Sequence, residues 1–264
     1  MKTIFITGAS TGLGKATAKL FAANGWKVIA TMRKPENEKE LTNIPNIILL
    51  PLDVTDPQQI TTTTQQAIAL GNVDVVFNNA GYGLMGPFEA ATDEQIVRQL
   101  NTNLLGAIRV TQAFIPHFRE KQSGLFITTT SVGGLITFPF SSLYHTTKWA
   151  LEGFNESLAF EMKKIGVSVK IVEPGGIKTD FLNRSADMIA HPAYEKWMKY
   201  MFAQINEDHF TAVEKIAEVV FEAATDGKDQ LRYLAGEDAK ANYGRRLQIG
   251  EAAFRQQMAG LLGE

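Results

Sequence analysis

The sequence predicts an α/β fold: one doubly wound domain over residues 1–264, built on a parallel sheet with helices on both faces. Short apolar runs alternate with amphipathic stretches of helix length, helix start signals lie between them, and a glycine-rich turn follows the first run. Strands that alternate with helices join in parallel through right-handed crossovers. The runs that fit buried strands are Thr3–Thr7, Lys27–Met32, Ile47–Leu50, Val73–Phe77, Leu125–Thr130 and Val167–Val172.

Composition and charge exclude several classes of protein. The chain has 264 residues, a formal net charge of −2 and no cysteine, so it forms no disulfide, thiolate metal site or iron–sulfur cluster. The balanced charge gives no electrostatic footprint for nucleic acid or an anionic membrane. No apolar run is long enough for a membrane span or a signal peptide, so we expect a soluble cytoplasmic protein. The histidines lack metal-ligand spacing, and no metal site is predicted among His117, His145, His191 and His209.

Three helix starts carry a capping pattern. Asp56 precedes Pro57 and is followed by Gln59, which predicts an N-cap aspartate and a capping box. Thr92–Gln95 and Thr211–Glu214 repeat the same spacing.

The section from about residue 181 to 208 breaks the alternation and is rich in Met, Trp, Tyr and Phe, so we expect a helical excursion over the sheet edge.

The glycine-rich turn predicts a phosphate site. The segment from Thr7 to Gly14 lies between the first strand and a helix expected to run to about Asn24. Glycines there permit a tight turn and close approach of phosphate to the helix N-terminus. The alternative is a glycine-rich turn that binds nothing. The candidate cofactor-binding residues in this turn are Gly8, Ser10, Thr11, Gly12, Leu13 and Gly14.

Residues after the next strands predict the nucleotide. Arg33 follows the second strand, where enzymes that use NAD(H) place an acidic residue, and its guanidinium fits a 2′-phosphate, so NADP(H) is favoured over NAD(H). Asp53, with Val54, follows the third strand and could accept from the adenine amino group. The segment Asn79–Gly81 ends the fourth strand, at the edge where open α/β sheets bind ligands. Solvated loop or turn residues are the alternative at each place.

A tyrosine and a lysine are the candidate catalytic pair. Tyr144 and Lys148 are spaced i, i+4 at the start of a helix expected to run to about Lys164, so both side chains lie on one face. An ammonium this close should lower the pKa of the phenol and make it a usable acid or base. Ser131 follows the fifth strand and could donate to a substrate carbonyl oxygen. Packing or turn roles are the alternatives, and a hydrolase is disfavoured because no Gly-x-Ser-x-Gly elbow surrounds the serine.

These motifs occur together in an order that resembles the short-chain dehydrogenases/reductases, in their one-domain branch. The matches cover the chain from residue 3 to about residue 180. They are T-G-x-x-x-G-x-G at Thr7–Gly14, N-N-A-G at Asn78–Gly81, N-x-x-G at Asn103–Gly106, Ser131 thirteen residues before the tyrosine, Y-x-x-x-K at Tyr144–Lys148 and P-G-x-x-x-T at Pro174–Thr179.

The resemblance implies a Rossmann-like sheet of about seven strands and a role for each matching residue. Tyr144 would be the general acid/base, Lys148 would tune it and bind the nicotinamide ribose, and Ser131 would hold the substrate oxygen. Asn103 would hold a water in a proton relay from Lys148. The residues implied to contact the adenine-ribose side or the nicotinamide carboxamide are Asn79, Ala80, Gly81, Pro174, Gly175, Ile177 and Thr179. A substrate lid at about residues 180–210 and a homodimer or homotetramer are also implied.

A narrower likeness points to an apolar substrate. Gly83–Glu89 and Leu231–Gly236 are similar to the branch that acts on steroids, retinoids and other apolar alcohols. Side chains that could line such a pocket, or pack in the core instead, are Leu135, Phe138, Phe140, Met188, Trp197, Met201 and Phe202. His145 is expected at the pocket rim or in solvent. The leading hypothesis is an NADP(H)-dependent oxidoreductase that interconverts a carbonyl and an alcohol; the alternatives are a catalytically silent NADP(H)-binding regulator and, less favoured, a sugar epimerase or dehydratase.

Overall fold

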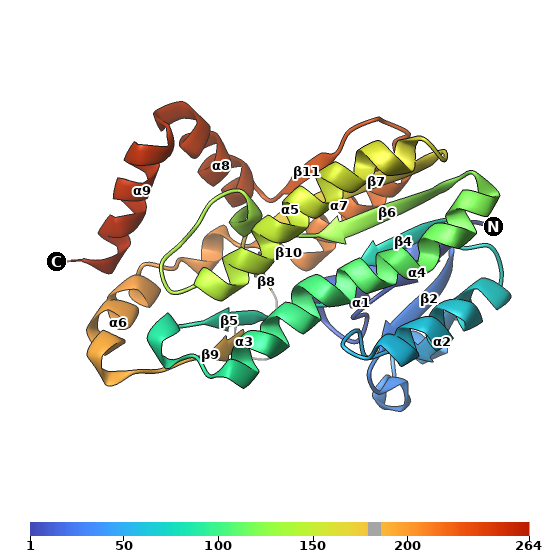
Figure 1. The fold of residues 1–264 in the computed structure, drawn as a ribbon, viewed down its shortest axis with the longest axis horizontal. Helices are drawn as coiled ribbons and strands as arrows, with labels where there is room; N and C mark the ends of the chain where they lie inside the picture. The colour runs from blue at the N-terminus through green and yellow to red at the C-terminus, as the bar shows by residue number, and fades with distance from the viewer. Residues whose placement is uncertain (179–185, 264) are drawn as a thin grey trace.

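The fold is organised around one seven-stranded parallel sheet. The computed structural model describes residues 1–178 and 186–263. The sheet has the order β11-β7-β6-β4-β1-β2-β3, and each neighbouring pair is parallel (Figure 1). The strands are β1 (Thr3–Ile6), β2 (Lys27–Met32), β3 (Ile47–Pro51), β4 (Val75–Asn78), β6 (Gly124–Thr129), β7 (Val167–Pro174) and β11 (Arg232–Ala235).

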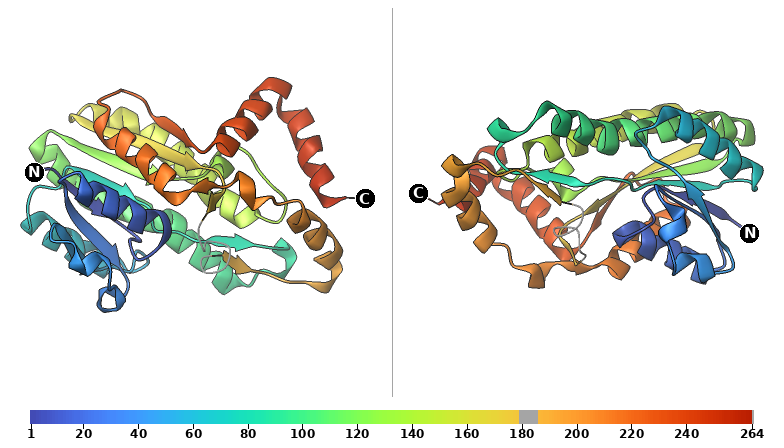
Figure 2. Two further views of the ribbon diagram at one scale, coloured as in Figure 1. Left: turned by 180° about the vertical axis from the view of Figure 1, so that it is seen from behind. Right: turned by 90° about the horizontal axis from the view of Figure 1, so that it is seen from below.

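Helices cover both faces of the sheet. Phe21 of one helix and Val220 of another pack into the core on one face, while Ile60, Phe114 and Leu158 pack on the other. Figure 2 shows these two layers edge-on, with the sheet between them. The first layer consists of α1 (Gly12–Ala23) and α7 (Val213–Thr225); the second consists of α2 (Pro57–Ala69), α4 (Gly106–Lys121) and α5 (Ser142–Lys163). The doubly wound α/β prediction is confirmed.

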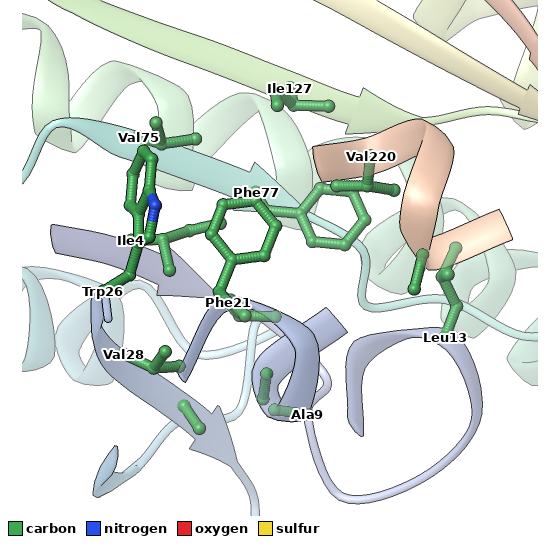
Figure 3. Packing of buried hydrophobic residues seen from close by; sticks show 14 of the residues in the cluster. Ile4, Ala9, Leu13, Phe21, Trp26, Val28, Val75, Phe77, Ile127 and Val220 are labelled. Atoms are coloured by element: carbon green, nitrogen blue, oxygen red, sulfur yellow. The ribbon is translucent and has the colours of Figure 1, made fainter. Parts of the chain in front are cut away.

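Interlocked aromatic rings fill the core between β1 and the first helical layer. The Phe21 ring lies 5.0 Å from Trp26 and 5.0 Å from Phe221, each edge to face. Figure 3 shows Phe21 beside Phe77 and Ile4. Edge-to-face pairs add stabilisation beyond the area they bury. This packing fixes α1 against β1, and with it the turn that joins them.

The predicted strands all form, and the seventh strand adds to them. Each observed strand lies within two residues of its predicted bounds, and β11 pairs with β7 at the edge of the sheet. Two of the three predicted helix starts are also confirmed. The Asp56 carboxylate accepts from the N–H groups of Gln58 and Gln59 at 2.8 and 3.1 Å, and Thr92 and Gln95 form a complete capping box. The Gln59 side chain, however, does not bond to the Asp56 N–H as a capping box requires; its Nε2 donates to the Asp56 carboxylate at 3.0 Å and its Oε1 accepts from the Asp53 N–H at 2.9 Å.

The third predicted helix start is wrong. Thr211 belongs to the short strand β10 (Thr211–Ala212), which pairs with β8 (Ile177–Lys178), and α7 begins at Val213 without a side-chain cap. Backbone pairing with the chain that follows β7 therefore outweighs the local capping pattern. The consequence for the site is that β10 holds the segment after Pro174 in place.

Smaller elements lie beyond the carboxyl edge of the sheet. β5 (Gly83–Met85) pairs in parallel with β9 (Ala186–Met188), and α6 (Glu195–Ala203) follows, so the described part of the expected excursion holds one strand and one helix. Residues 181–185 of that excursion, and Thr179, lie outside the described residues. The remaining helices are α3 (Asp93–Leu100), α8 (Glu237–Ile249) and α9 (Glu251–Ala259). Within the described ranges, no helix is long and apolar enough to cross a membrane.

Candidate active site

One large cleft opens at the carboxyl edge of the sheet. Its volume is about 1440 Å³, and its walls come from the turn after β1, the ends of β2, β4, β6 and β7, and the start of α5. The structure brings most of the predicted site residues into this lining: Gly8, Ser10, Thr11, Gly12, Leu13, Arg33, Asp53, Val54, Asn79, Ala80, Gly81, Ser131, Tyr144, Lys148, Pro174, Gly175 and Ile177. Gly14 and Asn103 lie behind the wall, and Thr179 lies outside the described residues.

Close backbone approach shapes the glycine turn. Gly8 has φ +67°, in the region that glycine adopts without strain. A Cβ on Gly14 would lie 2.3 Å from the carbonyl oxygen of Gly8 and 2.7 Å from Nδ2 of Asn79. Thr11, at the N-cap of α1, makes no side-chain cap, so the first N–H groups of that helix have no capping side chain. An anion fits such a helix N-terminus.

Hydrogen bonds from β4 hold this turn. Nδ2 of Asn79 donates to the carbonyl oxygens of Thr7 and Gly8 at 3.1 and 3.2 Å. In return, the Thr7 hydroxyl oxygen accepts from the N–H groups of Asn79 and Ala80 at 2.9 and 3.0 Å. Asn79 therefore supports the glycine turn as well as lining the cleft. Thr7 was missed as a functional residue, although its place at the end of the first strand was visible in the sequence.

Charged side chains gather at the end of the cleft near β2. Arg33 is exposed and lines the cleft with Thr11. Lys15 also lines it, and its ammonium pairs with Glu38 at 3.2 Å and Glu40 at 2.6 Å. Lys15 was not predicted, although it directly follows the glycine turn. Lys19 lines it as well and pairs with Glu40 at 2.5 Å, so the cleft has three cations at this end.

Asp53 is held by its own loop. Its carboxylate accepts from the Thr55 N–H at 2.9 Å and from the Thr55 hydroxyl at 2.7 Å. As expected, Asp53 is not a helix cap, because Asp56 caps α2. Val54 is buried against α4, where a Cβ on Gly106 would lie 2.9 Å from the Val54 side chain. Asp53 is thus fixed in direction at the edge of the cleft.

Three of the four predicted catalytic side chains, Ser131, Tyr144 and Lys148, meet at the other end of the cleft. Nζ of Lys148 lies 5.6 Å from the centre of the Tyr144 ring and donates to the carbonyl oxygen of Thr129 at 2.9 Å. The Ser131 hydroxyl accepts from the Gly133 N–H at 3.0 Å and donates to the carbonyl oxygen of Pro174 at 3.3 Å. A hydrogen bond also joins Ser131 to Tyr144. The phenol, the ammonium and the hydroxyl therefore lie side by side at this end of the cleft.

Burial controls the protonation of this pair. It raises the pKa of Tyr144, and the hydrogen bond with Ser131 opposes that shift. It also lowers the pKa of Lys148 to about 8, although the charge of Glu152 acts in the opposite direction. The expected lowering of the Tyr144 pKa is therefore wrong for this structure, because desolvation of the phenolate outweighs the hydrogen bond with Ser131.

Asn103 lies just behind the cleft. It belongs to a π-helical turn, Asn101–Leu105, between α3 and α4, and is 2% exposed. Its Oδ1 accepts from the Tyr82 N–H at 3.0 Å, and its Nδ2 donates to the Tyr82 carbonyl oxygen at 2.8 Å and to the Thr147 hydroxyl at 3.4 Å. Asn103 therefore ties the chain after β4 to α5, and its contacts do not include Lys148.

The substrate end of the cleft is only partly apolar. Of the predicted apolar residues, Phe138, Met201 and Phe202 line the cleft. The other four do not belong to its lining, and they are Leu135, Phe140, Met188 and Trp197. A charged pair, Arg98 and Asp187 at 2.8 Å, lies at the rim and links α3 to β9.

His145 lines the cleft but is buried, so the expectation of a solvent position is wrong. Its Nδ1 lies 2.7 Å from the carbonyl oxygen of Gly133, and its Nε2 accepts from the Phe138 N–H at 2.9 Å. The imidazole thus holds the loop between Ser131 and α5. Across the described residues, no group of three or more His, Asp or Glu side chains could hold a metal ion.

Charged residues that the sequence analysis missed lie in the wall of the catalytic end and behind it. Asp238, in the first turn of α8, accepts from the Gly176 N–H at 2.6 Å and fixes the turn after Pro174. The buried Glu152 and Glu173 and the half-buried Arg232 form a charged cluster next to Lys148. One signal for it was available, since Glu173 is an acidic residue that directly follows the apolar pair Ile171 and Val172 near the end of a buried strand.

Comparison with known proteins identifies the family. A family model described as short chain dehydrogenase matches residues 2–190. The chain belongs to this family. Human 17-beta-hydroxysteroid dehydrogenase type 1 is 31% identical over 254 residues, which cover 89% of this chain and 77% of that protein.

Two solved structures of high similarity support the assignment. A short-chain dehydrogenase from Streptomyces avermitilis has a TM-score of 0.87 and 32% identity, covering 98% of this chain and 94% of that one. The protein ElxO, in a structure described with NADP bound, has a TM-score of 0.75 and 26% identity, covering 88% of this chain and 97% of that one. This short chain dehydrogenase therefore shares its fold with nearly the whole length of both chains.

Proposed function

We propose that this protein is an NADP(H)-dependent oxidoreductase that interconverts a carbonyl and an alcohol on an apolar substrate. The observation that carries the proposal is the meeting of Ser131, Tyr144 and Lys148 in the same cleft as the glycine turn. A phenol and a hydroxyl near one point can hold a substrate oxygen and exchange a proton with it. The family to which the chain belongs supports this chemistry.

The glycine turn fits a dinucleotide. The space that a Cβ on Gly14 would fill is occupied by backbone, and the N-terminus of α1 has no capping side chain, so a pyrophosphate can approach it. When bound, NADP(H) supplies or accepts the hydride. The remaining proposed contacts are Arg33, Asp53, Val54, Asn79, Ala80, Gly81, Pro174, Gly175 and Ile177.

The choice of NADP(H) rests on the charge near β2. Arg33 lines the cleft and is exposed, and the nearby acidic residues Glu38 and Glu40 are paired with Lys15. A guanidinium can grip a phosphate with two hydrogen bonds. The NADP in the ElxO structure supports the same preference. NAD(H) remains the weaker alternative.

The chain's own residues would perform the proton transfer. In reduction, Tyr144 donates its phenolic proton to the substrate oxygen while Ser131 donates a hydrogen bond to the same atom; in oxidation both steps reverse. Lys148, kept cationic, stabilises the phenolate that reduction leaves behind. The water-holding role of Asn103 stays a prediction, because its described contacts are to Tyr82 and Thr147.

Three side chains and one relative support an apolar substrate. Phe138, Met201 and Phe202 line the substrate end of the cleft. The similarity to a hydroxysteroid dehydrogenase points in the same direction. A homodimer or homotetramer and a cytoplasmic location stay predictions.

A panel of carbonyl compounds tests the proposal. The purified protein should oxidise NADPH faster than NADH in the presence of apolar ketones, measured by loss of absorbance of the reduced nicotinamide. Turnover confined to small sugars or hydrophilic acids would contradict the substrate class. A protein that binds NADPH tightly and reduces nothing in the panel would be the silent regulator instead.

A further inference from the structure

A buried group of charges lies directly behind the catalytic pair. Glu152 follows Lys148 by four residues on α5, so both side chains lie on one helical face. Glu152 is 5% exposed, and its Oε2 accepts from Nε of Arg232 at 3.1 Å. Glu173, at the end of β7, is fully buried, and its Oε1 lies 3.4 Å from the same nitrogen. One guanidinium therefore faces two buried carboxyl groups.

The backbone makes room for this arrangement. A Cβ on Gly134 would lie 3.0 Å from Cγ of Glu152 and 3.1 Å from the carbonyl oxygen of Lys148. Glu152 thus fills the space between α5 and the 3-10 turn after Ser131. Arg232 belongs to the edge strand β11 and reaches Glu156 at 2.7 Å with its outer nitrogen. Helix, turn and edge strand together fix the position of the Glu152 carboxylate.

We propose that Glu152 is a positioning residue for the proposed reaction: anchored by Arg232, it is the buried counter-ion that keeps Lys148 protonated beside Tyr144. The inference rests on the proposed function, because the charge of Lys148 matters only if Tyr144 exchanges a proton. Glu152 does not touch the reacting atoms and acts on them through Lys148.

The charges facing this position account for its effect. They are Lys148 and Glu156 on α5, Glu173 on β7 and Arg232 on β11. Burial lowers the pKa of Lys148 to about 8, and Glu152 is the group that acts against this. Without an anion at Glu152, the pKa of Lys148 would fall further, and the lysine would be neutral over more of the alkaline range.

Glu173 differs from Glu152 in its charge. Burial, together with repulsion from Glu152, raises the pKa of Glu173 to about 8. Glu152 accepts a hydrogen bond from Arg232, whereas neither carboxyl oxygen of Glu173 has a hydrogen-bond partner. Burial raises the pKa of Glu152 as well, but hydrogen bonds from Thr130 and Arg232 and the charges of Arg232 and Lys148 oppose that shift, so a negative charge is better stabilised on Glu152 than on Glu173. Glu173→Gln is accordingly a matched control that removes a carboxyl without removing the charge.

Two variants measured by two methods test the inference. In the Glu152→Gln protein, the Lys148 amine should titrate about one pH unit lower than in the wild type, followed by NMR of ¹³C-labelled lysine with Lys148→Arg to assign the signal. The alkaline limb of the kcat/KM profile for ketone reduction should move to lower pH by the same amount. In Glu173→Gln, both curves should superimpose on those of the wild type up to about pH 7, where Glu173 is protonated, and the Lys148 titration should shift less than in Glu152→Gln. Thermal unfolding verifies that each variant is folded.

Equal titration of Lys148 in wild type and Glu152→Gln, or equal shifts in the two variants, would overturn the inference. If Glu152→Gln does not fold, Arg232→Gln takes its place, because loss of the guanidinium favours protonation of Glu152 and should shift Lys148 in the same direction. An unchanged Lys148 in that variant also overturns the inference. If the wild type reduces no carbonyl compound, the proposed function fails, and the NMR titration still decides whether Glu152 is the counter-ion.

Discussion

The glycine turn after β1 is held in position by backbone groups that lie too close together to admit a side chain. Gly14 lies against the carbonyl oxygen of Gly8, and Asn79 and Thr7 hold the turn by neutral hydrogen bonds. At the start of α5, the Lys148 side chain is held in position by buried charges. Lys148 and Glu152 are both nearly inaccessible, and Arg232 reaches in from an edge strand.

The difference between these two regions has a physical reason. A phosphate group needs a fixed array of N–H donors, which backbone supplies without any change of protonation. Proton transfer needs groups whose ionisation can change, and burial shifts the pKa values of such groups, downward for Lys148 and upward for Tyr144 and Glu173. The glycine turn should therefore be sensitive to added side-chain volume and insensitive to pH. The start of α5 should be sensitive to pH and less sensitive to added volume.

The largest effect is expected at the second region, from Tyr144→Phe. This variant removes only the phenolic oxygen, so ketone reduction should fall by about 10²–10⁴-fold, while NADPH binding should change little. Fluorescence titration of the bound nucleotide and steady-state kinetics measure the two quantities. Equal loss of binding and turnover would show that the residue positions the nucleotide rather than the proton.

Gly14→Ala tests the volume sensitivity of the first region. The added methyl group would lie 2.3 Å from the Gly8 carbonyl oxygen, so the free energy of unfolding should fall by about 3 kcal/mol. The matched control is Gly153→Ala on α5, where nothing lies within 4 Å of the added atom, and which should raise it by about 0.5–1 kcal/mol. Urea denaturation measures both. Similar effects in the two variants would contradict the packing argument.

Asp226→Asn tests buried charge away from the catalytic residues. Lys170, on β7, pairs with Asp226 at 2.6 Å, and the two side chains are 5% and 8% exposed. Burial alone would raise the pKa of Asp226, but the hydrogen bond from Lys170 lowers it to about 2. Loss of the carboxylate should reduce the free energy of unfolding by about 2–3 kcal/mol at pH 7.

The pH dependence of that effect follows from the lowered pKa of Asp226. A carboxyl group whose pKa is lower in the folded chain than in the unfolded chain stabilises the fold at pH values above its unfolded pKa, which is near 4. This stabilisation is lost as the pH falls toward 2. The wild type and Asp226→Asn should therefore converge in stability over that range. The exposed pair Lys163–Asp229 supplies a control, since Asp229→Asn should cost less than about 0.5 kcal/mol. An equal cost at Asp229 would count against the burial argument.

The smallest effect concerns the choice of nucleotide. Arg33→Ala should raise the Kd for NADPH about tenfold more than the Kd for NADH, because only NADPH presents a 2′-phosphate. Lys34→Ala is the control, since Lys34 does not belong to the lining of the cleft. Isothermal titration with both nucleotides measures the ratio. A loss of the same size for both would rule out Arg33 as the discriminating residue.

Much of the fold and the site could be predicted from local patterns. Apolar runs identified the central strands because those strands are buried on both faces, and the spacing of Tyr144 and Lys148 placed both on one helical face. β11 was not identified as a sheet strand, since its four residues include a charged one and have no long apolar run. Thr211 begins a capping pattern in the sequence, but in the structure it pairs with Ile177, a contact that the local sequence does not reveal.

Electrostatic environment was the part that the sequence could not provide. The spacing predicted that Lys148 lies next to Tyr144. The burial that raises the pKa of Tyr144 depends on the packing of the whole site, which the spacing does not reveal. For the same reason the pairing of Glu152 with Arg232 could not be foreseen, because the partners lie on separate elements that meet only in the fold.

Transfer of deuterium from labelled nucleotide is the most direct test of the central claim that this cleft positions a nicotinamide ring against a substrate carbonyl. NADPH carrying deuterium at one or the other face of C4 is supplied with an apolar ketone, and the alcohol is analysed by mass spectrometry. The account predicts that one of the two labels appears on the carbinol carbon and the other stays on the nucleotide. Product without deuterium from either label, or with deuterium from both, would contradict it.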